Sequence, residues 1–163
     1  MSNYQVIESS SNQYNINSYE VIIDNIGNSN SSYRFNRATG AVDNYGNLAV
    51  IPGGAIGGYG NDSYYITSGD AAIIYDGSNS SNDTLDLNFY LSSLVELFTI
   101  DNKHVVLAGY GFTVVVLYAF TTNGLIENLN FYDFDINNLT IQTTAAFVEA
   151  NKTRNNLTWE EAE

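Results

Sequence analysis

Nine consecutive residues, Gly57 to Tyr65, combine the residue types that bind a hard divalent cation. They fit every fixed position of the pattern G-G-x-G-x-D-x-U-x, in which U is a large apolar residue. The glycines let the backbone turn sharply and expose carbonyl oxygens, and the aspartate adds a charged oxygen where the turn ends. Calcium takes about six to eight oxygen ligands, so two stacked turns of this kind could share one ion. We therefore expect calcium as cofactor, with ligands from Gly57, Gly58, Tyr59, Gly60 and Asp62.

Two further aspartates follow this segment at informative spacings. Asp83, in the sequence Asn-Asp-Thr, lies 21 residues after Asp62, a length suited to one full circuit of a flattened β-roll. The positions before Asp83 hold Asn79, Ser80 and Ser81 instead of glycines, so a site there should be the weaker one. Asp70 follows a glycine and is a third candidate ligand. The alternative for each aspartate is a structural role, in which the carboxylate caps its own turn.

Residues 57–87 resemble a row of the repeats-in-toxin, or haemolysin-type calcium-binding, family. In such a row a Gly-Asn-Asp turn and a short strand precede a Gly-Asp pair, a second strand and another Asn-Asp-Thr turn. Residues 94–134 resemble the region that closes such arrays, chiefly through the segment 126–133 (IENLNFYD). The resemblance covers about half of the chain. It implies a parallel β-roll, calcium-dependent folding, and export by a type I secretion route that reads a C-terminal signal.

The charge balance favours cations as partners. Five Lys and Arg residues face 18 Asp and Glu residues, a formal net charge of −13. Such a surface repels nucleic acid phosphates and anionic lipid head groups, and it favours divalent cations, although acidity can also serve solubility alone. The absence of cysteine excludes thiolate metal sites and cysteine nucleophiles. The longest apolar run, 114–120, is too short to span a membrane, and residues 1–14 do not form a classical signal peptide.

The elements expected from the sequence are almost all strands. Gly, Asn, Asp and Ser punctuate short apolar stretches up to residue 90, and longer hairpin-like stretches follow. We therefore predict an all-β fold, a short parallel β-roll or β-helix capped by antiparallel strands, with one short C-terminal helix. Residues 1–18 are interpreted as a poorly ordered lead-in and residues 19–143 as a single β domain. Its calcium core spans about 43–90 and its antiparallel cap about 91–143. Residues 144–163, a helix capped by Thr143 or Thr144 and an acidic tail, would carry the secretion signal.

Catalysis is not predicted. His104, the only histidine, follows a turn and is expected to be a half-exposed strand residue. The sequence contains no Gly-x-Ser-x-Gly elbow that would support a Ser-His-Asp triad. No pair of carboxylates indicates the cleft of a glycoside hydrolase. The leading hypothesis is a secreted, non-catalytic calcium-binding domain, with a cell-surface glycan or a larger parent polypeptide as further partner. One alternative is a surface adhesin or carbohydrate-binding domain in which calcium is structural. The weakest alternative is a haem-binding or hydrolase domain that uses His104.

Overall fold

A computed structural model describes most of the chain. The described residues are 5–9, 13–16, 20–24, 31–35, 40–42, 48–50, 53–57, 61–66, 71–77, 82–88, 90–109 and 112–158. Within them, no helix is long and apolar enough to cross a membrane.

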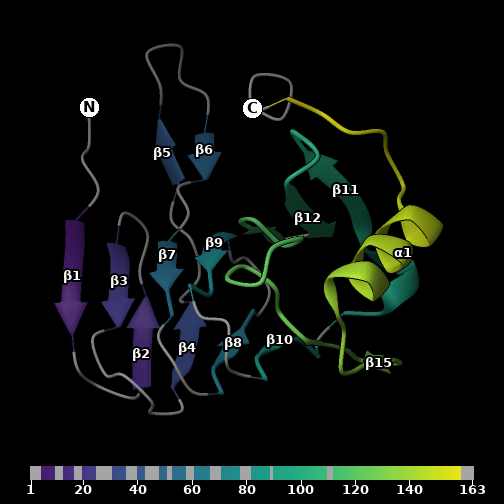
Figure 1. Ribbon diagram of the computed structural model, residues 1–163. Helices are drawn as coiled ribbons and strands as arrows, with labels where there is room; N and C mark the ends of the chain where they lie inside the picture. The colour runs from purple at the N-terminus through teal and green to yellow at the C-terminus, as the bar shows by residue number, and fades with distance from the viewer. Residues whose placement is uncertain are drawn as a thin grey trace.

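Two β-sheets face each other across the core (Figure 1). The seven-stranded sheet has the strand order β1 (Gln5–Ser9), β3 (Glu20–Asp24), β7 (Gly53–Ile56), β9 (Ala71–Tyr75), β13 (Phe112–Val116), β12 (His104–Gly109) and β11 (Glu96–Ile100). The six-stranded sheet has the order β15 (Asp135–Ile136), β14 (Asn128–Phe131), β10 (Thr84–Leu87), β8 (Ser63–Tyr65), β4 (Ser32–Phe35) and β2 (Gln13–Ile16). β5 (Gly40–Val42) and β6 (Leu48–Val50) pair only with each other among the described strands.

The chain alternates between the two sheets. We call one passage of the chain through a strand of the seven-stranded sheet and then a strand of the six-stranded sheet a circuit. β1, β3, β7, β9 and β13 pair in parallel in one sheet, and β2, β4, β8, β10 and β14 pair in parallel in the other. Parallel neighbours need a long connection, and here the strand of the opposite sheet supplies it. Equivalent residues of successive circuits therefore lie side by side.

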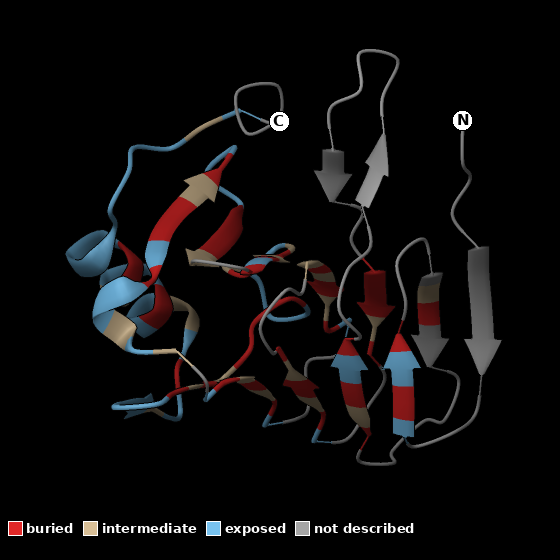
Figure 2. Ribbon diagram, turned by 180° about the vertical axis from the view of Figure 1, so that it is seen from behind, coloured by how far each residue is buried: buried red, intermediate tan, exposed pale blue. Residues whose placement is uncertain are grey.

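Side chains alternate between the core and the outside, as the two-residue period of a strand requires. Figure 2 shows buried residues alternating with more exposed ones along β2 and β4. In the six-stranded sheet the inward positions of β2, β4 and β8 hold Tyr14, Tyr33 and Tyr64, which stack with ring centroids 5.1 and 4.8 Å apart. The opposite inner face contributes aliphatic residues, among them Ile22, Ile74 and Val114. The parallel register thus places residues of the same type beside one another in the core, tyrosines in one sheet and aliphatic residues in the other.

The predicted fold class is wrong. The structure is mixed α/β: two mixed, mostly parallel sheets and one helix, rather than an all-β roll with an antiparallel cap. The antiparallel strands extend the same two sheets. β11 and β12 are joined by the tight turn 101–103, which permits only antiparallel pairing, and β13 pairs antiparallel with β12 and parallel with β9. Pairing direction is decided by where a strand returns, which the local pattern of residues does not contain.

Two further expectations also need correction. Residues 1–18 were expected to be a lead-in, yet β1 and β2 lie there and pair with the next strands of the two sheets. The helix α1 (Ile141–Asn151) starts earlier than residue 144. Its N-cap is Thr140, whose side chain accepts from the Thr143 N–H while the Thr143 side chain reaches back, so this capping box sets the start. Residues 159–163, the acidic tail, lie outside the described part of the chain.

The tyrosine stack yields a stability prediction. Tyr33 is fully buried between two other rings, so Tyr33→Ala should lower the free energy of unfolding by about 3–5 kcal/mol, as for other large aromatic truncations. Urea unfolding followed by circular dichroism measures this. Tyr132→Ala is the matched control, because Tyr132 is 71% exposed and should change stability by less than about 0.5 kcal/mol. Equal effects for the two variants would contradict the stacked arrangement.

Candidate metal centre

Four residues occupy the same place in successive circuits, directly before a strand of the six-stranded sheet. They are Ser31, Asp62, Asp83 and Glu127, which precede β4, β8, β10 and β14. The parallel registers of these strands place each of the four beside the next. Asp62 and Asp83, 21 residues apart, are therefore neighbours across one circuit.

Hydrogen bonds connect these four residues into a ladder, called the carboxylate ladder below. The Ser31 N–H donates to Asp62 Oδ1 at 3.0 Å, the Asp62 N–H to Asp83 Oδ1 at 2.8 Å, and the Asp83 N–H to Glu127 Oε1 at 2.8 Å. Each carboxylate thus accepts from the backbone of the preceding circuit. The result is that Asp62 and Asp83 turn inward and are 1% and 0% exposed.

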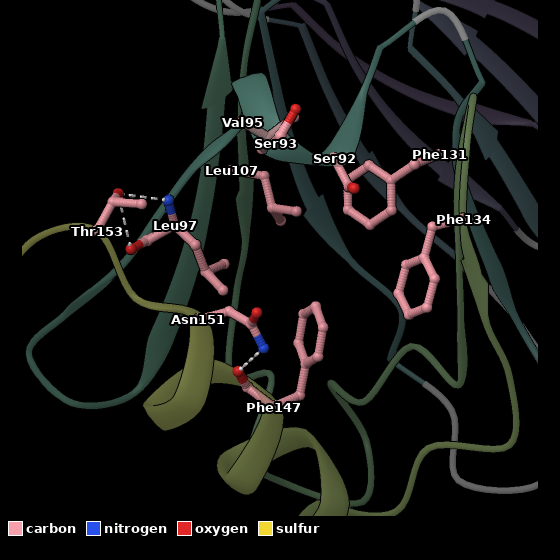
Figure 3. Close-up of a pocket in the computed structure, with 10 residues that line it drawn as sticks. All are labelled: Ser92, Ser93, Val95, Leu97, Leu107, Phe131, Phe134, Phe147, Asn151 and Thr153. Atoms are coloured by element: carbon pink, nitrogen blue, oxygen red, sulfur yellow. Dashed lines mark hydrogen bonds between the residues drawn. The ribbon is translucent and has the colours of Figure 1, made fainter.

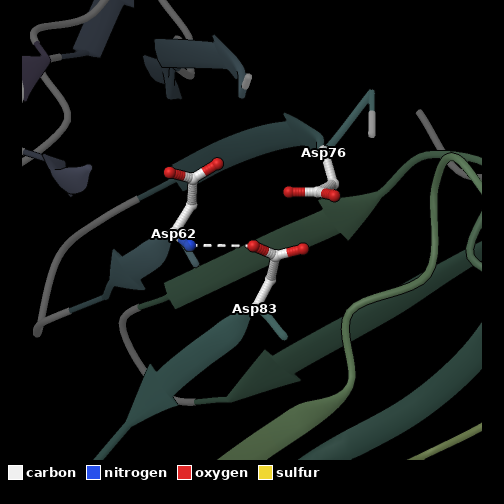
Figure 4. A group of neighbouring side chains, drawn as sticks. All are labelled: Asp62, Asp76 and Asp83. Atoms are coloured by element: carbon white, nitrogen blue, oxygen red, sulfur yellow. Dashed lines mark hydrogen bonds between the residues drawn. The ribbon is translucent and has the colours of Figure 1, made fainter. Parts of the chain in front are cut away.

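A third aspartate enters from the opposite sheet. Asp76 directly follows β9 and is 0% exposed, and its Oδ1 accepts from the Tyr64 hydroxyl at 3.0 Å. Its other oxygen, Oδ2, is buried and has no hydrogen-bond partner within the described residues. Asp62, Asp76 and Asp83 each place one carboxylate oxygen within 4.8 Å of the others (Figure 4). We call these three residues the aspartate cluster.

Gly57 leaves the space that the aspartate cluster occupies. The register of β7 with β9 pairs Ile56 with Tyr75, so Gly57 follows its strand at the place where Asp76 follows the neighbouring one. A Cβ atom on Gly57 would lie 3.1 Å from Asp62 Oδ2 and would collide with the Tyr64 hydroxyl. A glycine at this position is therefore required by a close approach of side chains, in addition to any need for a turn.

Burial makes the charge of the aspartate cluster costly. The pKa of Asp76 is raised from 3.8 to about 10. Burial is the largest cause and the Asp83 carboxyl beside it acts in the same direction, while the Tyr64 hydrogen bond opposes the change. Burial and the Asp76 charge also raise the pKa of Tyr64 well above its usual value. Three buried carboxylates cannot all remain charged without compensation, so the cluster needs either a proton or a cation.

The geometry of the aspartate cluster is compatible with one hard cation. Oxygens bound to the same calcium at about 2.3–2.6 Å lie at most about 5 Å apart, and the three oxygens meet this condition. The described residues thus offer three carboxylate ligands, while a full calcium shell needs further oxygens. The same arrangement accepts other hard cations, so it is not specific to calcium.

The structure brings some of the predicted ligands together and adds one. Asp62 and Asp83 meet in the aspartate cluster, and Gly57 borders it. Gly58, Tyr59, Gly60 and Asp70 lie outside the described residues. Asp76 was missed because no glycine pattern precedes it. The sequence did contain one signal. Asp76 stands between the apolar strand 71–75 and Gly77, and this strand belongs to the same circuit as Asp83.

His104 differs from its expected half-exposed position. It begins β12, is only 4% exposed, and its Nδ1 accepts from the Tyr118 N–H at 3.0 Å. Burial lowers the pKa of His104 below its usual 6.5. The Tyr118 ring packs edge-on against the imidazole, with centroids 4.7 Å apart. The imidazole therefore contributes to the packing at this end of β12.

A glycine substitution tests the packing around the aspartate cluster. Gly57→Ala should lower the free energy of unfolding by about 1–3 kcal/mol, because the new methyl group displaces the Tyr64 hydroxyl from Asp76. Gly54→Ala, in the same strand β7, is the control, because its Cβ would make ordinary contacts of 3.4 Å or more. Denaturant unfolding of both variants checks this. If Gly57→Ala leaves the free energy of unfolding unchanged while Gly54→Ala lowers it, this packing is contradicted.

The pH dependence of stability without metal follows from Asp76. Its pKa is raised in the folded state, so the folded chain holds a proton that the unfolded chain releases, and stability should fall as pH rises toward about 10. The fall should reach at most about 1.4 kcal/mol per pH unit. The lowered pKa of His104 acts in the opposite direction and only near or below pH 6.5. Urea unfolding in chelator between about pH 7 and pH 9 separates the effect of Asp76 from that of His104. Asp76→Asn should abolish the dependence of the unfolding free energy on pH in this range. An unchanged dependence in this variant would contradict the assignment to Asp76.

A scan against protein-family models matches no family, and a search of curated proteins finds no match.

Proposed function

We propose that this chain is a non-catalytic calcium-binding domain and that the aspartate cluster holds the ion. The observation that carries the proposal is the buried Asp76 Oδ2, which has no hydrogen-bond partner in the described residues and belongs to the cluster formed with Asp62 and Asp83. An unsatisfied buried carboxylate oxygen is costly. A bound cation supplies the missing interaction and neutralises the charge of its neighbours.

Charge and ligand chemistry favour calcium for this role. Carboxylate oxygens are ligands of hard cations, and the sequence of segment 57–62 is of the glycine-rich type whose backbone carbonyls calcium accepts. The net charge of −13 attracts divalent cations to the molecule. Magnesium requires a smaller, strict octahedron and keeps several of its waters, so a dry cluster of carboxylates suits it poorly.

The ion would connect the two sheets. Asp76 follows β9 of the seven-stranded sheet, whereas Asp62 and Asp83 precede β8 and β10 of the six-stranded sheet. A cation bound by all three therefore fastens the end of one strand to the beginnings of two others. Binding that occurs only in the folded state stabilises that state, which makes the domain's stability depend on the calcium concentration.

We further propose that the domain acts outside the cell. Extracellular calcium modules bind at about 10⁻⁴–10⁻³ M, and we expect the aspartate cluster to bind calcium in this range. The resemblance to the repeats-in-toxin family supports secretion, with a larger polypeptide or a cell-surface glycan as further partner. His104 supports the non-catalytic part, since its side chain is only 4% exposed and packs against the Tyr118 ring.

A melting experiment tests calcium binding. At about 10 mM calcium, roughly one hundred times the expected Kd, binding should add about 2.7 kcal/mol and raise Tm by roughly 5–10 °C relative to chelator. Magnesium at the same ionic strength should raise Tm far less. Equal Tm shifts with calcium and with magnesium would mean that the effect is charge screening and not binding of calcium at a site.

Two variants locate the ion. Asp76→Asn should leave the stability in chelator unchanged or higher, because the neutral amide replaces a carboxyl that holds a proton, and it should abolish the calcium shift. Asp135→Asn is the matched control, because Asp135 is exposed in β15 and its variant should respond to calcium as the wild type does. If Asp76→Asn retains the full shift, the ion is bound elsewhere.

A further inference from the structure

A cavity of about 490 Å³ lies beneath the helix α1, and none of its lining residues belongs to the aspartate cluster. Leu97 of β11 and Leu107 of β12 line it from the seven-stranded sheet, and Phe131 of β14 lines it from the other sheet. Phe147 of α1 and Phe134 complete the apolar walls (Figure 3). Its volume falls in the range of about 300–1,000 Å³ that small-molecule sites occupy.

The rim of this cavity is held in place by hydrogen bonds. The 3₁₀ turn η1 (Ser92–Leu94) is fastened to Asp133 by the Ser92 N–H at 2.8 Å and the Ser92 hydroxyl at 3.0 Å. On the other side, the Thr153 N–H donates to the Leu97 carbonyl at 2.7 Å, and Thr153 Oγ1 accepts from the Leu97 N–H at 2.9 Å. The opening is therefore preformed, which lowers the ordering cost of binding.

The lining separates apolar surface from a few polar groups. Three phenyl rings border the space, and Phe131 and Phe134 are roughly parallel, with an interplanar angle of 22° and centroids 6.5 Å apart. The polar lining residues are Ser92, Ser93, Asn151 and Thr153, and none of the lining residues carries a charge. The Asn151 side-chain nitrogen donates to the Phe147 carbonyl at 2.8 Å, and its oxygen Oδ1 has no partner within the described residues.

Large apolar side chains are exposed at the opening. Phe134 lines the cavity and is 46% exposed, and Leu94, in the turn η1 that forms the rim, is 69% exposed. Exposed apolar residues that adjoin a concave site mark a surface that contacts apolar material. The neighbourhood thus offers apolar contact both inside the cavity and at its entrance.

We propose that this cavity binds one neutral, ring-bearing apolar molecule that carries a single hydrogen-bonding group. The phenyl rings favour an aromatic or planar ring, which they contact edge-on or in offset stacks. The uncharged lining offers no partner to a charged group, and a chain with net charge −13 repels an anion. The hydrogen-bonding group of the ligand would face the hydroxyls and the Asn151 amide.

A matched pair of fluorescent probes tests the ligand class. N-phenyl-1-naphthylamine is neutral, whereas 8-anilino-1-naphthalenesulfonate has the same ring system and an added sulfonate. The neutral probe should bind the full-length protein saturably at one site, with enhanced and blue-shifted emission. The anionic probe should bind at least tenfold more weakly, which corresponds to about 1.4 kcal/mol. Equal or tighter binding of the anionic probe would overturn the neutral class.

Two tryptophan variants locate the site. Ser93 is exposed at the rim, so Ser93→Trp should fill the entrance and weaken the neutral probe at least tenfold. Gln142→Trp adds the same side chain to an exposed position of α1 that does not line the cavity and should bind as the wild type does. Circular dichroism establishes that both variants fold. Unchanged binding by folded Ser93→Trp, or no saturable binding by the wild type, would refute the proposal.

Discussion

The carboxylate ladder is the interaction on which the rest of the structure depends. Where the chain enters the six-stranded sheet, a backbone N–H in one circuit donates to a carboxylate of the next, from Ser31 through Asp62 and Asp83 to Glu127. Buried N–H groups at these turns need acceptors, and short acidic side chains at equivalent positions provide them. The cost is a row of carboxylates in the interior. This arrangement places Asp62 and Asp83 beside Asp76 and creates the demand for a proton or a cation.

The ladder also sets the register of the core. Because it aligns the residues before β4 and β8, the inward positions of these strands coincide and Tyr33 stacks on Tyr64. The parallel register of β2 with β4 adds Tyr14 to the stack. A slip of one residue would turn every side chain of a strand to the opposite face. Tyr64, the ring at one end of the stack, donates its hydroxyl hydrogen to Asp76, so the aromatic core and the polar cluster share one residue. The packing of the aromatic core and the geometry of the aspartate cluster are therefore coupled through the same strand.

The C-terminal region uses different means to close the structure. β11 and β12 form an antiparallel pair, and α1 packs beside β11 with Val148 in the core. Thr153 and Leu157 return to the backbone of β11, which fastens the chain after the helix. The space between helix and sheets is not filled, and the cavity lined by Phe131, Phe134 and Phe147 is the result. The two proposed binding sites thus arise from two different modes of packing.

The sequence by itself determined the features that depend on neighbouring residues. The pairing of Asp62 with Asp83 across 21 residues and most strand positions were predictable, because one circuit needs about that length and alternating apolar residues act locally. Tertiary structure alone decided the direction of strand pairing, which made the predicted fold class wrong. It alone brought Asp76 from the opposite sheet into the aspartate cluster and buried His104 against Tyr118. These outcomes depend on which segments meet in space, and the spacing of residues along the chain carries no such information until the sheets are assembled.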